Sequence, residues 1–265
     1  MKRIILISSL LLVIFLSACV QQPTAVQPSK DGRVVFVITD AAADMQAVSS
    51  LSVTVDSVKV HSATEGWVTV SSTPKTYDLL KLKAEGSKVL LTDIQLKEGT
   101  YQQVRLDISK VFVVDANGEH EAKLPSGELK IVGEVVVKPN TTSAVTFDFI
   151  ADESLHFTGN GEYILAPVVH FETHEDADVE VKADGKVEIK AGKLKTKVNV
   201  GMDIDGNVGV GLAIGKDVDL VVDGAKIKLG LGIGKAKQQS KENISSDTSM
   251  TDGQTSSNTS VQVSV

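Results

Sequence analysis

The sequence predicts an all-β fold, in which an antiparallel β-sandwich is followed by a glycine-rich β-meander and a disordered C-terminal tail. Three observations favour it. Short runs of β-branched residues recur along the chain, turn dipeptides separate them, and few stretches show helical periodicity. Many short strands with a turn about every ten residues are typical of a sandwich rather than of an α/β fold.

The N-terminus has the pattern of an export signal. A basic start precedes the uncharged apolar run 4–16, and Leu16-Ser17-Ala18-Cys19 then places small residues before the only cysteine. This tetrapeptide resembles a lipoprotein lipobox. The resemblance implies cleavage after Ala18 and lipidation of Cys19, and therefore an extracytoplasmic protein anchored to the cell membrane by lipid. The alternative is an ordinary buried thiol at the end of a hydrophobic helix, but the run is shorter than the ~20 residues of a membrane span.

The chain is expected to divide into five parts. Residues 1–18 form the signal peptide, and residues 19–32 comprise the lipidated cysteine and a flexible spacer that contains two prolines. A β-sandwich domain covers 33–174, and a meander of hairpins covers 175–236. The serine- and threonine-rich tail 237–265 is predicted to be disordered because it is almost free of apolar residues before Val261.

The expected strands of the sandwich follow the β-branched runs. Alternation is clear in 51–56, where apolar and polar side chains fall on opposite faces. The predicted strands are 34–39, 51–60, 67–70, 89–94, 101–108, 111–114, 128–138, 143–150 and 163–171. The predicted turns between them are Glu65-Gly66, Glu98-Gly99, Asn117-Gly118 and Ser126-Gly127. Only 44–49 and 77–82 are candidate short helices.

The later region differs in character. Asp184-Gly185, Asp205-Gly206 and Asp223-Gly224 separate alternating runs, which favours hairpins over an extension of the sandwich. The alternation leaves one apolar face between Val198 and Ile214. That face must be covered by curling into a barrel, by packing on the first domain, by a partner or by lipid.

Composition and net charge argue against two classes of binding function. The net charge of −7 argues against nucleic acid as a partner, because no basic stripe is available to neutralise phosphates. The single tryptophan, Trp67, argues against a platform of several stacked rings but leaves one exposed ring open.

The candidate chemistry is sparse. Asp40 and Asp44 flank three alanines and could reach a calcium ion, although an aspartate after a strand more commonly bonds nearby backbone amides. With Trp67 and Asp148 they form the candidate ligand or cation loop. His170 and His174 lie four apart in a predicted strand, about 13 Å from one another, which argues against a zinc site. The sequence therefore predicts no catalytic residue and no bound metal, with calcium as the alternative.

A set of short motifs, taken in order, resembles the domain of unknown function 4382 family of prokaryotic, often lipid-anchored proteins. The resemblance covers about 33–171 and implies a β-sandwich on an exported lipoprotein, with no established activity. This chain has Ala42 where the family usually has proline and Ile150 where it usually has an acidic residue. The motifs include Val37-Ile38-Thr39-Asp40, Gly66-Trp67, Gly99-Thr100-Tyr101, Phe147-Asp148-Phe149 and Ile164-Leu165-Ala166-Pro167.

Three functions remain open at the level of sequence. The first is a non-enzymatic, lipid-anchored domain that binds or scaffolds another envelope component, a protein or a glycan. The second is a carbohydrate- or calcium-dependent binding module that uses the loops around Asp40, Trp67 and Asp148. The third is an envelope enzyme whose residues converge only in the fold. A deep pocket with clustered carboxylates would favour the enzyme, and a flat face would favour a binding protein.

Overall fold

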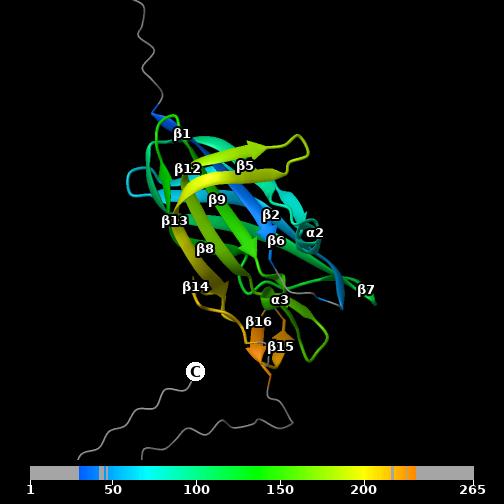
Figure 1. Cartoon of the computed structure of the whole chain (residues 1–265). Helices are drawn as coiled ribbons and strands as arrows, with labels where there is room; N and C mark the ends of the chain where they lie inside the picture. Colours follow the sequence, from blue (N-terminus) through cyan, green and yellow to red (C-terminus); the bar gives the residue numbers. More distant parts are fainter. Residues whose placement is uncertain (1–29, 42–44, 46, 216–217, 225, 231–265) are drawn as a thin grey trace, which may run out of the picture. The chain divides into compact units, whose positions relative to one another are not determined.

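A computed structural model describes residues 30–41, 45, 47–215, 218–224 and 226–230, and two six-stranded sheets account for most of them (Figure 1). Ala18, Cys19, Asp44 and the predicted tail 237–265 lie outside these residues. So do the predicted signal peptide and nearly all of the spacer. Within the described ranges, no helix is long and apolar enough to cross a membrane.

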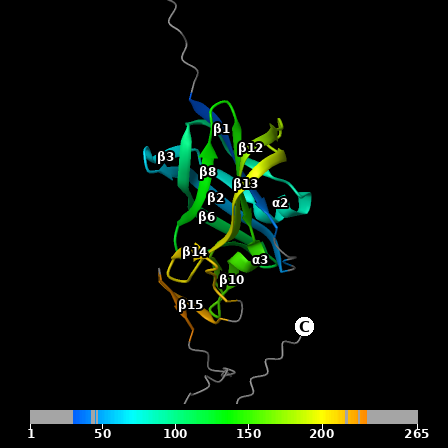
Figure 2. The same ribbon diagram turned by 60° about the vertical axis from the view of Figure 1, so that its left-hand side comes forward.

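The first sheet, sheet A, has the strand order β14-β13-β12-β9-β1-β5. The second, sheet B, has the order β3-β2-β6-β7, with β4 also paired to β2 and β8 also paired to β6. Figure 2 shows β3 beside β2 in sheet B. The bounds in sheet A are β1 Asp31–Asp40, β5 Val89–Lys97, β9 Thr142–Phe149, β12 Val168–Val181, β13 Val187–Met202 and β14 Val208–Val210. Those in sheet B are β2 Val48–Ser62, β3 Gly66–Ser71, β4 Lys75–Asp78, β6 Gly99–Asp115, β7 Gly118–Glu121 and β8 Glu128–Val137.

The core lies between the sheets and is made of the alternate residues of each strand. On β1, Phe36 and Ile38 point into it, and on β6, Val104 and Leu106 do so. The all-β prediction is confirmed, and most predicted strands fall within observed ones. The predicted strands 128–138 and 143–150 each run one residue past β8 and β9, and the predicted strand 163–171 covers two observed strands, Tyr163–Leu165 and the start of β12, with a break between them. One strand pair departs from the predicted antiparallel arrangement, because β1 and β9 run parallel to each other. These strands are far apart in sequence, so no short hairpin forces them to run in opposite directions.

The predicted boundary at residue 174 falls inside β12, so the prediction that the later hairpins do not extend the sandwich is wrong. β12 pairs with β9, and β13 pairs with β12 along its whole length. The far half of this two-stranded ribbon bends over the outer face of sheet A, where its apolar side chains cover Val35 and Val37. A β-bridge between Val89 and Lys186 fixes the tip. The composition changes along the ribbon because the near half of β12 is also paired with β9, whereas much of the far half of the ribbon is exposed.

The apolar face of the meander is covered mainly by the protein itself. Met202 and Ile214 pack with Ile164 and with Leu220, the first residue of a separate hairpin. This hairpin consists of β15 Leu220–Asp223 and β16 Lys226–Leu229, and a further small hairpin consists of β10 Leu155–Phe157 and β11 Tyr163–Leu165. Val210 remains 72% exposed. Packing on the sandwich and on the hairpin of β15 and β16 therefore covers most of the face.

Two short helices complete the described fold, α2 Leu79–Glu85 and α3 Ala151–Ser154. Asp78 caps α2 by accepting a hydrogen bond from the Lys81 amide, and Gly86 ends it in the left-handed conformation with φ 56°. The predicted helix 77–82 thus overlaps α2 but begins too early. The predicted helix 44–49 is wrong in its described part, because β2 starts at Val48.

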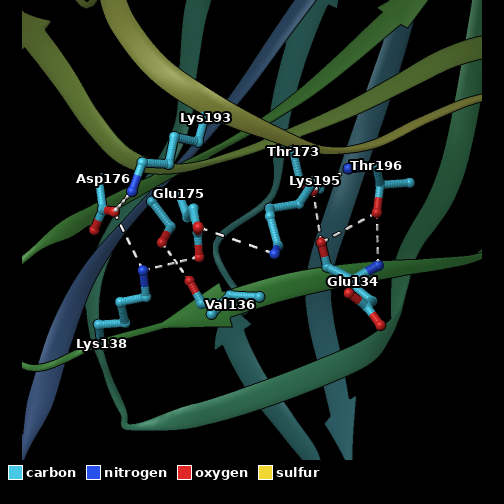
Figure 3. Close-up of polar contacts among 10 residues, drawn as sticks. Glu134, Val136, Lys138, Thr173, Glu175, Asp176, Lys193, Lys195 and Thr196 are labelled. Carbon is cyan, nitrogen blue, oxygen red and sulfur yellow. Dashed lines mark hydrogen bonds and ion pairs between the residues drawn. The ribbon is translucent and has the colours of Figure 1, made fainter.

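A polar seam joins β8 of sheet B to β12 and β13 of sheet A (Figure 3). Thr173 donates to the Glu134 carbonyl at 2.5 Å, and Thr196 accepts from the Glu134 amide at 2.8 Å. Lys138 pairs with Glu175 at 3.0 Å at one end of the seam. The buried Thr173 and Thr196 therefore supply hydrogen bonds to the Glu134 backbone at the edge of β8.

Candidate binding face

The structure separates the predicted ligand or cation loop. Asp40, at the end of β1, is buried, and its Oδ1 accepts a hydrogen bond from the Ala151 amide at 3.1 Å. Asp40 and Ile38 share the inward face of β1, whereas Asp148 lies between the inward-facing Phe147 and Phe149 and therefore points outward. Two carboxylates on opposite faces of one sheet cannot hold one ion. Asp40 thus bonds a backbone amide, but this amide lies 111 positions along the chain and is not one of the nearby amides expected from the sequence.

Asp148 has a polar environment of its own on the outer face of sheet A. Its register partner on β12 is His170. Burial raises the pKa of Asp148 above its ordinary value, and the charges of His170 and Lys88 only partly oppose this. His170 and His174 both lie within β12, which runs beyond the predicted strand end at residue 171. Among the residues that the structure describes, no group of three or more His, Cys, Asp or Glu side chains could hold a metal ion.

Trp67 lies on sheet B, apart from both aspartates. The Glu65-Gly66 turn places it opposite His61 on β2, with the two ring centroids 5.0 Å apart. The Arg105 guanidinium, on the next strand β6, lies 4.4 Å from the centre of the indole ring. Trp67 remains 40% exposed. The tryptophan is thus supported from the sheet side by a cation and an imidazole, and part of its ring is left open to solvent.

Two ion pairs lie on the same outer face of sheet B as the ring. Arg105 pairs with Glu128 at 2.8 Å, and Lys59 pairs with Asp107 at 2.6 Å. These side chains alternate with core residues such as Val58, Val60, Leu106 and Leu129 and therefore point away from the core. We call this surface the Trp67 face. It consists of Ser57, Lys59, His61, Trp67, Arg105, Asp107 and Glu128.

The electrostatics of the Trp67 face favour neutral ligands. Burial by itself would raise the pKa of Asp107, but hydrogen bonds from Lys59 and Ser57 hold it below its ordinary value. Each of the two carboxylates is therefore matched by a cation. The face offers a flat aromatic ring together with several hydrogen-bond donors and acceptors, which is the chemistry that recognises hydroxyl-rich molecules.

Only Trp67 of this face was predicted as a site residue. The hairpin signal Glu65-Gly66 could have indicated His61, because a tight turn places the two side chains opposite each other. Nothing in the local sequence indicates Arg105, which reaches the ring only through the pairing of β2 with β6.

Three carboxylates border a cavity of about 500 Å³ between α2 and the tip of the β12–β13 ribbon. Asp78 caps α2, Glu85 pairs with Lys186 at 3.0 Å, and Asp184 accepts from the Lys186 amide at 3.1 Å. The hydrogen bond from Lys186 lowers the pKa of Glu85, whereas a general acid would need a raised one. These carboxylates hold a helix end and a turn, which gives them a structural role.

A protein-family model described as Domain of unknown function (DUF4382) matches residues 31–167. The match confirms the resemblance over nearly all of its predicted span. No curated protein matches the chain, and no solved structure does.

Proposed function

The chain belongs to the DUF4382 family, and from this premise we propose that it is a lipid-anchored, extracytoplasmic binding domain without catalytic activity. In this proposal Cys19 carries the lipid and the Trp67 face contacts the ligand. A lipobox-like sequence supports the anchor, and the all-β body supports a role in binding or scaffolding.

The observation that carries the proposal is that His61 and Arg105 both contact the ring of Trp67. An exposed tryptophan whose ring lies 4.4 Å from a guanidinium is held in place before any ligand arrives. Such preorganisation lowers the entropy lost on binding. Aromatic and arginine side chains also dominate the energetics of binding surfaces in general.

The Trp67 face lies near the start of the folded domain. Lys97 is the register partner of Asp31, the first residue of β1, and it pairs at 2.9 Å with Glu65, two residues before Trp67. Residues 19–29 would span at most about 40 Å between a lipid on Cys19 and β1. The proposed ligand is therefore a component of the envelope close to the anchoring membrane.

A carbohydrate is the ligand class that the Trp67 face favours. The flat sheet surface carries one open aromatic ring, on which a sugar ring can stack, and ion-paired side chains that can bond hydroxyl groups. A calcium-dependent mode has less support, because Asp40 and Asp148 point to opposite faces of sheet A.

Intrinsic fluorescence tests this directly, because Trp67 is the only tryptophan in the chain. The full chain is titrated with soluble peptidoglycan fragments and with chito- and cello-oligosaccharides. We expect a shift in Trp67 emission, and we expect calorimetry to show binding that Trp67→Ala abolishes and Phe157→Ala leaves intact. Binding that survives Trp67→Ala would contradict the assignment of the binding site to the Trp67 face. The absence of binding to any of these glycans would contradict the proposal that the ligand is a carbohydrate.

Membrane fractionation tests the anchor separately. Cys19→Ser should release the protein from membranes, whereas the wild type stays with them. Persistent membrane association of the variant would show that another part of the chain contacts lipid.

A further inference from the structure

A second cavity lies away from the Trp67 face, at the Asn117-Gly118 hairpin. Its volume is about 450 Å³, which falls in the range of small-molecule sites. We call it the Asp115 pocket: Ala47, Val48, Ser49, Asp115, Ala116, Asn117 and Tyr163. Asp115 is the one member of this set that is charged at neutral pH.

The Asp115 carboxylate is fixed in position by three hydrogen bonds. It accepts from the Asn117 amide at 2.7 Å, from the Tyr163 hydroxyl at 2.9 Å and from His120 Nε2 at 3.0 Å. The bond from Asn117 is the main reason that the pKa of Asp115 falls to about 2. The pocket therefore presents a permanent negative charge whose direction is set before a ligand binds.

Aromatic rings stand next to this charge. The Tyr163 ring contacts both His120, at 5.7 Å, and Phe157, at 4.8 Å between ring centroids. Phe157 is 65% exposed although it is a large apolar side chain. A carboxylate beside aromatic faces is the arrangement that attracts organic cations, through charge and through the ring quadrupole.

Lysine and arginine are absent from the strand segments that form the pocket: 111–122 contains Glu119 and Glu121, and 47–58 contains neither basic residue. His120 is the one basic side chain in these segments; it pairs with Asp115 at 3.0 Å and carries a positive charge only when it is protonated. A metal ion is a poorer fit, because hard cations need several oxygen ligands. No group of three or more candidate ligands exists in the described part of the chain.

From these observations we propose that the Asp115 pocket binds a small alkylammonium compound, with Asp115 as the counter-ion and Tyr163, against which Phe157 packs, as the aromatic contact. The site is independent of the Trp67 face and of the carbohydrate proposed there.

Choline is the probe, and its uncharged isostere 3,3-dimethylbutanol is the matched control ligand. Calorimetry on the full chain should show choline binding, with the isostere weaker by about tenfold or more because it has the same shape without the charge. Equal binding of the two compounds, or no binding of choline, would overturn the proposal without any mutation.

Variants then assign the residues. Asp115→Asn should weaken choline binding about tenfold, and Phe157→Ala should weaken it less, whereas Asp223→Asn, at another hairpin, should leave it unchanged. Circular dichroism reports whether Asp115→Asn folds, since Asp115 also braces the hairpin. Choline affinity that is unchanged in a folded Asp115→Asn variant would overturn the role of the carboxylate, and if this variant fails to fold, the comparison of choline with its isostere decides.

Discussion

Asp40 and Asp148 lie on adjacent strands of the same sheet and point to opposite faces of it. The parallel register pairs Thr39 with Asp148 and Asp40 with Phe149, so Asp40 shares the buried face with Phe149 while Asp148 faces outward. Asp40 therefore bonds a backbone amide on the buried face, whereas Asp148 lies beside His170 on the outer face. Their contributions to stability should differ in size, in sign and in pH dependence.

Asp40→Ala should lower the free energy of unfolding by about 1–3 kcal/mol, because the buried Ala151 amide loses its acceptor. Asp40→Asn keeps an oxygen at this position and should cost less. Urea denaturation of both variants at neutral pH measures the difference. Stabilisation of the wild type by calcium that both Asp40→Asn and Asp148→Asn abolish would contradict the separate placement of the two residues.

Asp148→Asn should raise the free energy of unfolding at pH 7 and leave it unchanged near pH 3. Burial raises the pKa of Asp148 in the folded protein, so the folded state binds its proton more tightly than the unfolded state. The wild type then loses stability as the pH rises from the ordinary pKa of an aspartate through the raised one. The gain in the variant should stay below about 1 kcal/mol, because solvent screens a half-exposed group.

Denaturation curves of the wild type and Asp148→Asn between acidic and neutral pH provide the measurement. A variant that is less stable than the wild type at pH 7 would show that attraction by His170 and Lys88 outweighs burial.

The strands could be predicted because their signals are local. β-branched runs and the Gly-containing turns fixed most element positions, and Asp184-Gly185, Asp205-Gly206 and Asp223-Gly224 all form turns as predicted. The pairing of β1 with β9 has no local signal, since it depends on how distant segments pack. For that reason Asp40 and Asp148 were predicted as one site although they face apart.

The residues of the Trp67 face could be predicted from the sequence only in part, for the same reason. Trp67 was recognised from its rarity, and its neighbour His61 follows from the hairpin, but Arg105 joins them only through the β2–β6 register. The Asp115 pocket was missed for a similar reason. Asn117-Gly118 predicted the turn, whereas Tyr163 reaches Asp115 from a hairpin 48 positions later.

The contact between Arg105 and Trp67 should contribute about 0.5–1 kcal/mol, the value of a partly exposed cation–π pair. A double-mutant cycle with Arg105→Met and Trp67→Leu isolates this coupling from the packing of each side chain. Denaturant curves of the wild type, the two single variants and the double variant supply the four unfolding free energies of the cycle. A coupling energy near zero would show that the guanidinium does not position the ring, and it would weaken the argument for a preorganised face.

Gly133→Ala should destabilise the protein by about 1–3 kcal/mol, because a methyl group at this position overpacks the seam between the sheets. A Cβ atom on Gly133 would lie 2.7 Å from Phe171 Cε1 and 2.9 Å from Thr196 Cγ2. Phe171 belongs to the core, and Thr196 holds the edge of β8, so neither can move without loss elsewhere. Gly159→Ala is the matched control, since its nearest neighbour would be 4.0 Å away. Denaturation should separate the two variants, and hydrogen exchange should show faster opening of β8 in Gly133→Ala alone. Equal stability of both variants would mean that β8 does not close against β12 and β13 in solution.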